Sequence, residues 1–181
     1  RLVHLFRAWG MEPGDCVAVL IGNDDAFFDV FWACHRAGLY FTPVNWHLQR
    51  DEIEYIVDNC DAKVFLAHAR FAETAATAAS GVASFRAIED ELANVPPDAP
   101  LEEELEGSVM LYSSGTTGRP KGVRRPLRRV PAGDPGTVMA SVGLTALFGM
   151  REGDVYLSPA PLYHAAPLVF ASSQHRIGAT A

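Results

Sequence analysis

The sequence predicts an α/β fold built on a mainly parallel sheet. Three short apolar runs, at residues 16–21, 40–44 and 63–67, are each followed by a longer segment with apolar residues at helical spacing. Strands that alternate with helices in this way typically pair in parallel, because each helix carries the chain back across the sheet. The chain has 181 residues, of which 49% are hydrophobic, enough for a packed core in one domain or a large part of one.

The N-terminal residues predict a helix, a turn and the first strand. Val3, Phe6 and Trp9 lie three residues apart, which is the spacing of one helix face. Residues 13–15, Pro-Gly-Asp, are a turn signal. Residues 16–21 are short and apolar, as expected for a buried strand.

A helix follows this strand. Asn23 or Asp24 can cap it, because a short side-chain oxygen accepts a hydrogen bond from an otherwise unpaired backbone N–H. Gly38 ends it, since glycine readily adopts the left-handed conformation that closes many helices. The face that we predict to be buried comprises Phe27, Val30, Phe31 and Cys34.

The alternation continues through two more strands. Residues 40–44 predict the second strand, and residues 63–67 predict the third. Asp51 opens the helix between them, and an alanine-rich helix near residues 71–79 follows the third strand. The predicted buried face of the helix at Asp51 comprises Ile53, Ile56, Val57 and Cys60.

An acidic segment divides the chain. Residues 95–107 read VPPDAPLEEELEG, and this mixture of prolines and acids predicts a solvated surface linker. We therefore expect a first α/β half (1–94), the acidic linker (95–107) and a third segment (108–181).

The third segment predicts two strands and a helix. Residues 108–112 predict a short strand that leads directly into a glycine-rich stretch. Residues 137–149 predict a mostly apolar helix; the apolar stretch Thr137–Met150 has 14 residues, too few to span a bilayer, so we expect a buried helix. Residues 154–158 predict a further strand.

Charge and cysteine content narrow the function. The net charge is −7, with 22 acidic against 15 basic residues, which argues against a nucleic-acid partner. The three cysteines, Cys16, Cys34 and Cys60, form no CxxC pair, so neither a zinc site nor a disulfide framework is predicted. We see no signal peptide and no transmembrane segment, and we expect a cytoplasmic protein with core thiols. A homo-oligomer is compatible with the sequence.

Residues 113–122, SSGTTGRPKG, fit a phosphate-binding loop. Glycines let backbone N–H groups approach an oxyanion without a side chain in the way. Lys121 adds a point charge for a phosphate oxygen. The hydroxyl donors are Ser113, Ser114, Thr116 and Thr117. A surface loop with an incidental lysine is the alternative interpretation.

Two other phosphate motifs do not match this stretch. Counted from Gly115, the P-loop pattern requires Gly at 120 and Ser or Thr at 122, where this chain has Pro120 and Gly122. The dinucleotide pattern GxGxxG requires glycines two positions apart, and the stretch has none.

Residues 112–123, YSSGTTGRPKGV, resemble the signature loop of the adenylate-forming superfamily. That superfamily includes acyl-CoA synthetases, luciferases and the adenylation domains of peptide synthetases. The resemblance covers nearly the whole chain but only the front part of the family's large domain. The other segments that look like the family's pattern are 14–18, Asn23, 36–38, 43–45, Glu52, Tyr55, Ile56, 157–159 and 161–164.

The resemblance implies ATP, Mg²⁺ and, as co-substrate, CoA. In this family the loop handles the β- and γ-phosphates of ATP while a carboxylate attacks the α-phosphate. The products are an acyl-adenylate and pyrophosphate, and the CoA thiol then takes the acyl group. Carried over to this chain, Lys121 is also a catalytic residue and Thr116 a candidate contact for Mg²⁺. The implied nucleotide-binding residues are Ser113, Ser114, Gly115, Thr116, Thr117, Gly118 and Lys121.

A run of positive charge surrounds this loop. Arg119 and Lys121 begin it, and no acid intervenes before its end, so the local field favours ATP despite the acidic total. The run continues with Arg124, Arg125, Arg128 and Arg129. For these four arginines a solvated basic face remains the alternative.

Residues 161–164, Pro-Leu-Tyr-His, are the second candidate site. We expect them at a strand end, where open α/β sheets place ligands. A histidine beside a tyrosine is commonly no more than a packed residue. The resemblance implies instead that the pair lies between the acyl and nucleotide sites. We therefore predict that His164 is a catalytic residue that contacts the substrate and acts by position or charge, and that Tyr163 shapes the acyl pocket.

The chain departs from the family pattern after Val123. It continues with RRPLRR and a Pro/Gly stretch to Gly136, where the family moves quickly into a helix. The resemblance places the acidic Mg²⁺ ligand, the ribose-binding aspartate and the small C-terminal domain beyond Ala181. We therefore expect an AMP-forming acid–thiol ligase, acting on a fatty or other apolar acid, of which this chain alone does not complete the reaction.

Two other functions remain open. An adenylation domain that loads a carrier protein shares every motif above, and residues 163–168 favour CoA only weakly over it. A non-catalytic nucleotide-binding module is the alternative from another class.

Overall fold

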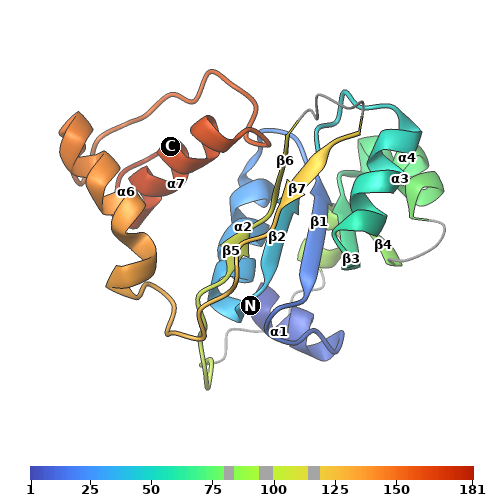
Figure 1. The fold of residues 1–181 in the computed structure, drawn as a ribbon, viewed down its shortest axis with the longest axis horizontal. Coiled ribbons are helices and arrows are strands. Elements are labelled where there is room, and N and C mark those ends of the chain that lie inside the picture. The colour runs from blue at the N-terminus through green and yellow to red at the C-terminus, as the bar shows by residue number, and fades with distance from the viewer. Residues whose placement is uncertain (80–83, 94–99, 114–118) are drawn as a thin grey trace. The chain divides into compact units, whose positions relative to one another are not determined.

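The computed structural model describes residues 1–79, 84–93, 100–113 and 119–181 (Figure 1). Its strands are β1 (Cys16–Leu20), β2 (Tyr40–Pro43), β3 (Ala62–Ala67), β4 (Ser84–Ala87), β5 (Ser108–Val109), β6 (Leu111–Ser113) and β7 (Lys121–Val123). Its helices are α1 (Leu2–Ala8), α2 (Asp25–Ala37), α3 (Arg50–Asn59), α4 (Ala72–Ala78), α5 (Ile88–Ala93), α6 (Pro135–Phe148) and α7 (Ala165–Arg176), and a 3-10 turn, η1, spans Ala69–Phe71.

The main sheet confirms the predicted α/β class. Its order is β4-β3-β1-β2-β5, and every neighbouring pair is parallel. β1 lies in the middle and is buried along its whole length, as expected for a parallel strand with helices on both faces. β6 and β7 form a separate antiparallel pair.

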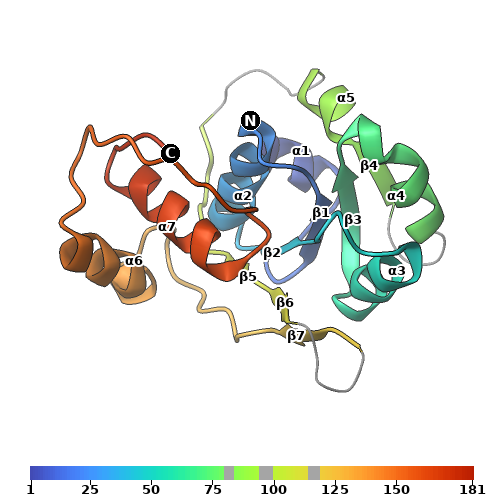
Figure 2. The ribbon, with the colours of Figure 1, turned by 90° about the horizontal axis from the view of Figure 1, so that it is seen from above.

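Helices cover both faces of the main sheet (Figure 2). On one face, Phe41 of β2 contacts Phe27 and Phe31 of α2, with ring centroids 5.2 and 5.4 Å apart. On the other face, Leu20 of β1 and Ile56 of α3 belong to one buried cluster. Successive residues of a strand point to opposite faces, so one strand supplies both layers of the core.

The predicted helix ends agree closely with the structure. Of the two candidate caps for α2, Asp24 accepts a hydrogen bond from the N–H of Ala26 (3.0 Å). Gly38 ends α2 with a φ of 71°, which is the left-handed region. α3 begins one residue earlier than predicted, because Gln49 and Glu52 form a capping box ahead of it.

The described part of the acidic segment is not the solvated linker that its composition predicts. Both carboxylate oxygens of Glu104 accept hydrogen bonds from the Arg36 guanidinium, at 2.6 and 2.7 Å. Glu106 is only 6% exposed, and its carboxylate lies 3.0 Å from Nδ1 of His35. His35 and Arg36 lie in the last turn of α2. The Arg36 guanidinium binds Glu104 and the His35 imidazole contacts Glu106, so this part of the segment packs against α2.

Three further expectations differ from the structure. β4 and α5 were not predicted, because residues 84–93 carry neither a clear apolar run nor a cap. The predicted strand at 154–158 is wrong: within the described residues, Val155 makes one isolated bridge to Thr180 and is 83% exposed. The helix predicted at 137–149 exists, but it is not buried, since Leu147 is 77% exposed.

The chain divides into two compact units, Arg1–Ala132 and Gly133–Ala181. The first holds both sheets and α1 to α5, and the second holds α6 and α7. The three cysteines are buried free thiols in the first unit, as predicted. Among the described residues, none of the helices is long and apolar enough to cross a membrane.

Candidate functional site

The first candidate site is the hairpin formed by β6 and β7. β5 extends the main sheet beside β2, and the chain then leaves that sheet to form β6. The register pairs Ser113 with Lys121 and Tyr112 with Gly122. The two ends of the glycine-rich stretch are therefore held opposite each other, as a phosphate cradle requires. Both Ser113 and Lys121 are exposed.

The predicted contacts between these two ends lie outside the described residues. They are Ser114, Gly115, Thr116, Thr117 and Gly118. Their roles, including the Mg²⁺ contact of Thr116, stay predictions. Within the described ranges, no group of three or more His, Cys, Asp or Glu side chains could hold a metal ion.

Tyr112 and Gly122 fit together across the hairpin. A Cβ atom at position 122 would lie 2.8 Å from Cζ and 2.9 Å from the hydroxyl oxygen of Tyr112, and 2.6 Å from Cε of Met110. Only glycine leaves room for the ring at this place. The Tyr112 hydroxyl then donates a hydrogen bond to Oδ1 of Asn59, at the end of α3 (2.7 Å). Burial raises the pKa of Tyr112 well above its usual range, so the phenol stays protonated and remains a donor.

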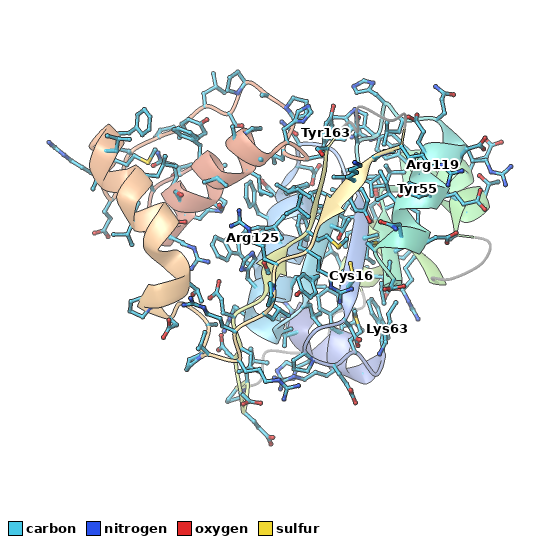
Figure 3. All side chains as sticks on the ribbon, in the orientation of Figure 1. Cys16, Tyr55, Lys63, Arg119, Arg125 and Tyr163 are labelled. Carbon is cyan, nitrogen blue, oxygen red and sulfur yellow. The ribbon has the colours of Figure 1, made fainter. Side chains whose placement is uncertain are left out.

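The cations that flank the hairpin have different surroundings. The Arg119 guanidinium lies over the ring of Tyr55 in α3, 5.2 Å from the centroid (Figure 3). The Arg124 guanidinium lies 4.3 Å from the ring centroid of Tyr40 and donates a hydrogen bond to the carbonyl of Gly14 (2.9 Å). All four arginines that follow Val123 in this run are exposed. Arg124 nevertheless makes these contacts with the domain, whereas the exposure of Arg125, Arg128 and Arg129 fits a solvated basic face.

The second candidate site precedes α7. His164 is the N-cap residue of this helix, and not the end of a strand as predicted. Its backbone carbonyl accepts a hydrogen bond from Leu168 (3.2 Å), while its imidazole is on the surface and does not cap the helix. The Tyr163 and His164 rings are in contact, with centroids 4.5 Å apart. Pro161 and Pro167 shape the turn before the helix and its first turn, which is where proline is tolerated.

The sequence analysis did not predict the contacts of α3 with the hairpin, which Tyr55 and Asn59 make. Asn59 was not a candidate, and Tyr55 was noted only as part of the family pattern. A signal exists in the sequence: Tyr55 and Asn59 are four residues apart, so they share one helix face. Asn59 is exposed, and Tyr55 is half-buried at the margin of the core.

Comparison with known proteins agrees with these observations. A model of AMP-binding enzymes matches residues 1–181. A feruloyl-CoA synthase of Amycolatopsis sp. is 32% identical over 93% of this chain and 33% of its own length. The fatty acid–[acyl-carrier-protein] ligase ScoC of Streptomyces coeruleorubidus is 28% identical over 99% of this chain and 36% of its own length.

Solved structures show the same fold. The inhibitor-bound N-terminal domain of FACL13 from Mycobacterium tuberculosis superposes with a TM-score of 0.78 over 98% of this chain and 46% of its own, at 25% identity. The O-succinylbenzoate coenzyme A synthetase of Bacillus subtilis, in complex with ATP and magnesium ion, gives 0.78 over 99% and 46% of the chains, at 21% identity.

The extent of these matches has two consequences. The chain spans about a third of the length of the curated relatives it matches, so the activity of the whole protein is a separate question. The family model, in contrast, matches the chain from its first residue to its last. The chain belongs to the AMP-binding enzyme family, whose relatives include acyl-CoA and acyl-carrier-protein ligases.

Proposed function

We propose that this chain supplies the phosphate-handling hairpin of an enzyme that activates a carboxylic acid with ATP and transfers the acyl group to CoA. The observation that carries the proposal is the pairing of Ser113 with Lys121. It brings a hydroxyl and an ammonium group to the two ends of the glycine-rich stretch, and both side chains are exposed. Hydroxyl donors and a lysine fit the oxygens of a triphosphate.

In the proposed reaction, a carboxylate oxygen bonds to the α-phosphorus of ATP as the bond to the β-phosphate oxygen breaks. Pyrophosphate leaves with the electron pair of the broken bond, so negative charge develops on its oxygen. Lys121 would neutralise part of this charge, which grows in the transition state, and Ser113 would hold a phosphate oxygen by its hydroxyl. Magnesium, when bound, would supply further charge neutralisation, with Thr116 as a candidate contact. The thiol of CoA would then attack the acyl carbon and release AMP.

We further propose that residues 161–164 contact the acid. His164 would position the carboxylate by hydrogen bonding or charge, and Tyr163 would form part of the acyl pocket. We propose an apolar acid, fatty or aromatic, because the relatives include a feruloyl-CoA synthase and a fatty acid ligase. The cytoplasmic location stays a prediction from the unpaired cysteines.

The test is carboxylate-dependent exchange of pyrophosphate into ATP by the full-length protein. Lys121→Ala removes a hydrogen bond to a charged group, so we expect the exchange rate to fall roughly ten- to a hundred-fold. The control is Lys63→Ala. Lys63 is the only other lysine in the sequence, and it pairs with Asp15 (2.8 Å) at the opposite end of the strands from Arg119 (Figure 3). Unchanged exchange in Lys121→Ala would contradict the proposal.

A carrier protein is the second candidate acceptor, because one relative is an acyl-carrier-protein ligase. The second half-reaction, after the adenylate has formed, distinguishes the two acceptors. Thioester product with CoA alone supports the CoA ligase, and product only with a holo carrier protein supports the alternative.

A further inference from the structure

The outer face of α3 touches both arms of the hairpin. On the β6 arm, the Tyr112 hydroxyl donates its hydrogen bond to Asn59 (2.7 Å). On the β7 arm, the Arg119 guanidinium lies over the ring of Tyr55, 5.2 Å from its centroid. Figure 3 shows Arg119 and Tyr55 side by side near the start of β7. One helix thus contacts Tyr112, just before the glycine-rich stretch, and Arg119, near the end of that stretch.

The contact of Arg119 lies in an acidic setting. A hollow of about 410 Å³ lies between Arg119, Pro120 and α3. The acids that line it are Asp51, Glu52, Glu54 and Asp58. Carboxylates around a guanidinium that already stacks on an aromatic ring add attraction to the cation–π contact. The contact with Tyr55 is the direct one, and the surrounding carboxylates add a negative field that salt weakens.

The opposite face of α3 makes the helix a fixed support. Ile53, Ile56 and Val57 are at most 2% exposed and belong to the core between α3 and the sheet. The capping box of Gln49 and Glu52 closes the N-terminal end of the helix. Side chains on such a helix have few alternative positions, so they can define where a hairpin lies.

We propose that Tyr55 and Asn59 are positioning residues that hold the two arms of the hairpin in the geometry that receives the triphosphate. This inference rests on the proposed function of the hairpin. Neither residue needs to touch the nucleotide, because Tyr55 acts through Arg119 and Asn59 acts through Tyr112. Releasing an arm lowers the fraction of molecules with a competent hairpin, and the apparent affinity for ATP falls by that fraction.

The test is a pair of double-mutant cycles in the full-length enzyme, with KM for ATP as the readout. Tyr55→Leu removes the ring, and a cation–π contact at an exposed site corresponds to roughly a two- to five-fold change. We expect that rise in KM for ATP, an unchanged KM for the acid, and no further rise when Tyr55→Leu is added to Arg119→Ala. Asn59→Ala and Tyr112→Phe should be non-additive in the same way.

The conservative variant separates positioning from folding. Tyr55→Phe keeps an aromatic face for Arg119 and should restore the wild-type KM for ATP. A merely structural residue would lower the apparent kcat by reducing the amount of folded enzyme, and it would leave both KM values unchanged. Additive effects within both cycles, or equal changes in the two KM values, would overturn the inference.

Hydrogen–deuterium exchange distinguishes this inference from the proposed function. Amides of residues 119–123 should exchange faster in Tyr55→Leu than in wild type, whether or not the enzyme shows pyrophosphate exchange. Arg50→Ala is the matched control, because Arg50 pairs with Glu54 within α3 (3.8 Å). Unaltered exchange in Tyr55→Leu would exclude the anchoring, even if Lys121→Ala had abolished activity.

Discussion

At the scale of single residues, Tyr112 and Gly122 make a close fit across the hairpin, because a Cβ atom at position 122 would lie 2.8 Å from the Tyr112 ring. Lys121 and Ser113 were candidates because of their side-chain types, and the structure pairs them across the hairpin. Asp24 was one of two possible caps, and geometry chose between them. The fit of Tyr112 over Gly122 could not be predicted, because it depends on the register between β6 and β7. The sequence alone does not reveal that register.

Gly122→Ala tests that fit. The added methyl group would force the Tyr112 ring away from β7 and its hydroxyl away from Asn59. We expect the free energy of unfolding to fall by about 1–3 kcal/mol, the usual cost of overpacking. Urea unfolding followed by circular dichroism measures it.

Gly143→Ala is the matched control for this change. Gly143 lies within α6, and a Cβ atom there meets nothing within 4 Å. Alanine at an exposed helix position should stabilise by about 0.5–1 kcal/mol. A loss of stability in both variants would mean that crowding at Gly122 is not the cause.

At the scale of helices and strands, the sequence predicted the elements that have a buried face of their own. β1, β2 and β3 are short, mostly apolar and almost wholly buried, and α2 and α3 have one apolar face each. The failures lie where burial depends on distant segments. The pattern of residues 154–158 predicts a strand, but within the described chain these residues form one isolated β-bridge, between Val155 and Thr180. The composition predicts that Glu104 and Glu106 are solvated, but they contact the side chains of Arg36 and His35 on α2.

The attachment of this acidic segment to α2 should depend on pH. Hydrogen bonds from Arg36 lower the pKa of Glu104 below its ordinary value of 4.5. A carboxyl with a lowered folded pKa stabilises above its unfolded pKa, and that stability is lost as pH falls through the folded value. Glu104→Gln should therefore cost about 0.2–1 kcal/mol at neutral pH, because the pair is partly exposed.

The measurement is the difference in unfolding free energy between wild type and Glu104→Gln as a function of pH. The difference should be constant above 4.5 and shrink below it. Glu102→Gln, a change of an exposed neighbouring carboxylate, serves as control. A difference that grows as the pH falls would refute the role of the Arg36–Glu104 pair.

At the scale of the whole molecule, the two compact units differ in how far their apolar side chains are buried. The first contains the sheet and the large buried core. In the second, Leu147, Phe148 and Val155 are each more than half exposed. The apolar composition of residues 137–150 predicted burial, but composition cannot say against what a helix packs.

The first unit should therefore fold without the second. We expect residues 1–132 to unfold cooperatively in urea, because the five-stranded sheet, both layers of helices and the hairpin lie within them. Circular dichroism and intrinsic fluorescence should give coincident transitions. A broad transition without a cooperative midpoint would show that residues 133–181 are needed to complete the core.

The order of strands in the sheet has a consequence for synthesis on the ribosome. β1 to β4 are complete by Ala87, but β5, which pairs with β2, begins only at Ser108. Until then β2 is an open edge whose backbone groups on one side are free to pair with another chain. The strand that leads into the hairpin of β6 and β7 is also the strand that pairs with this edge. A nascent chain that stalls before Ser108 should recruit chaperones or aggregate, whereas one released a few residues later has no such edge at β2.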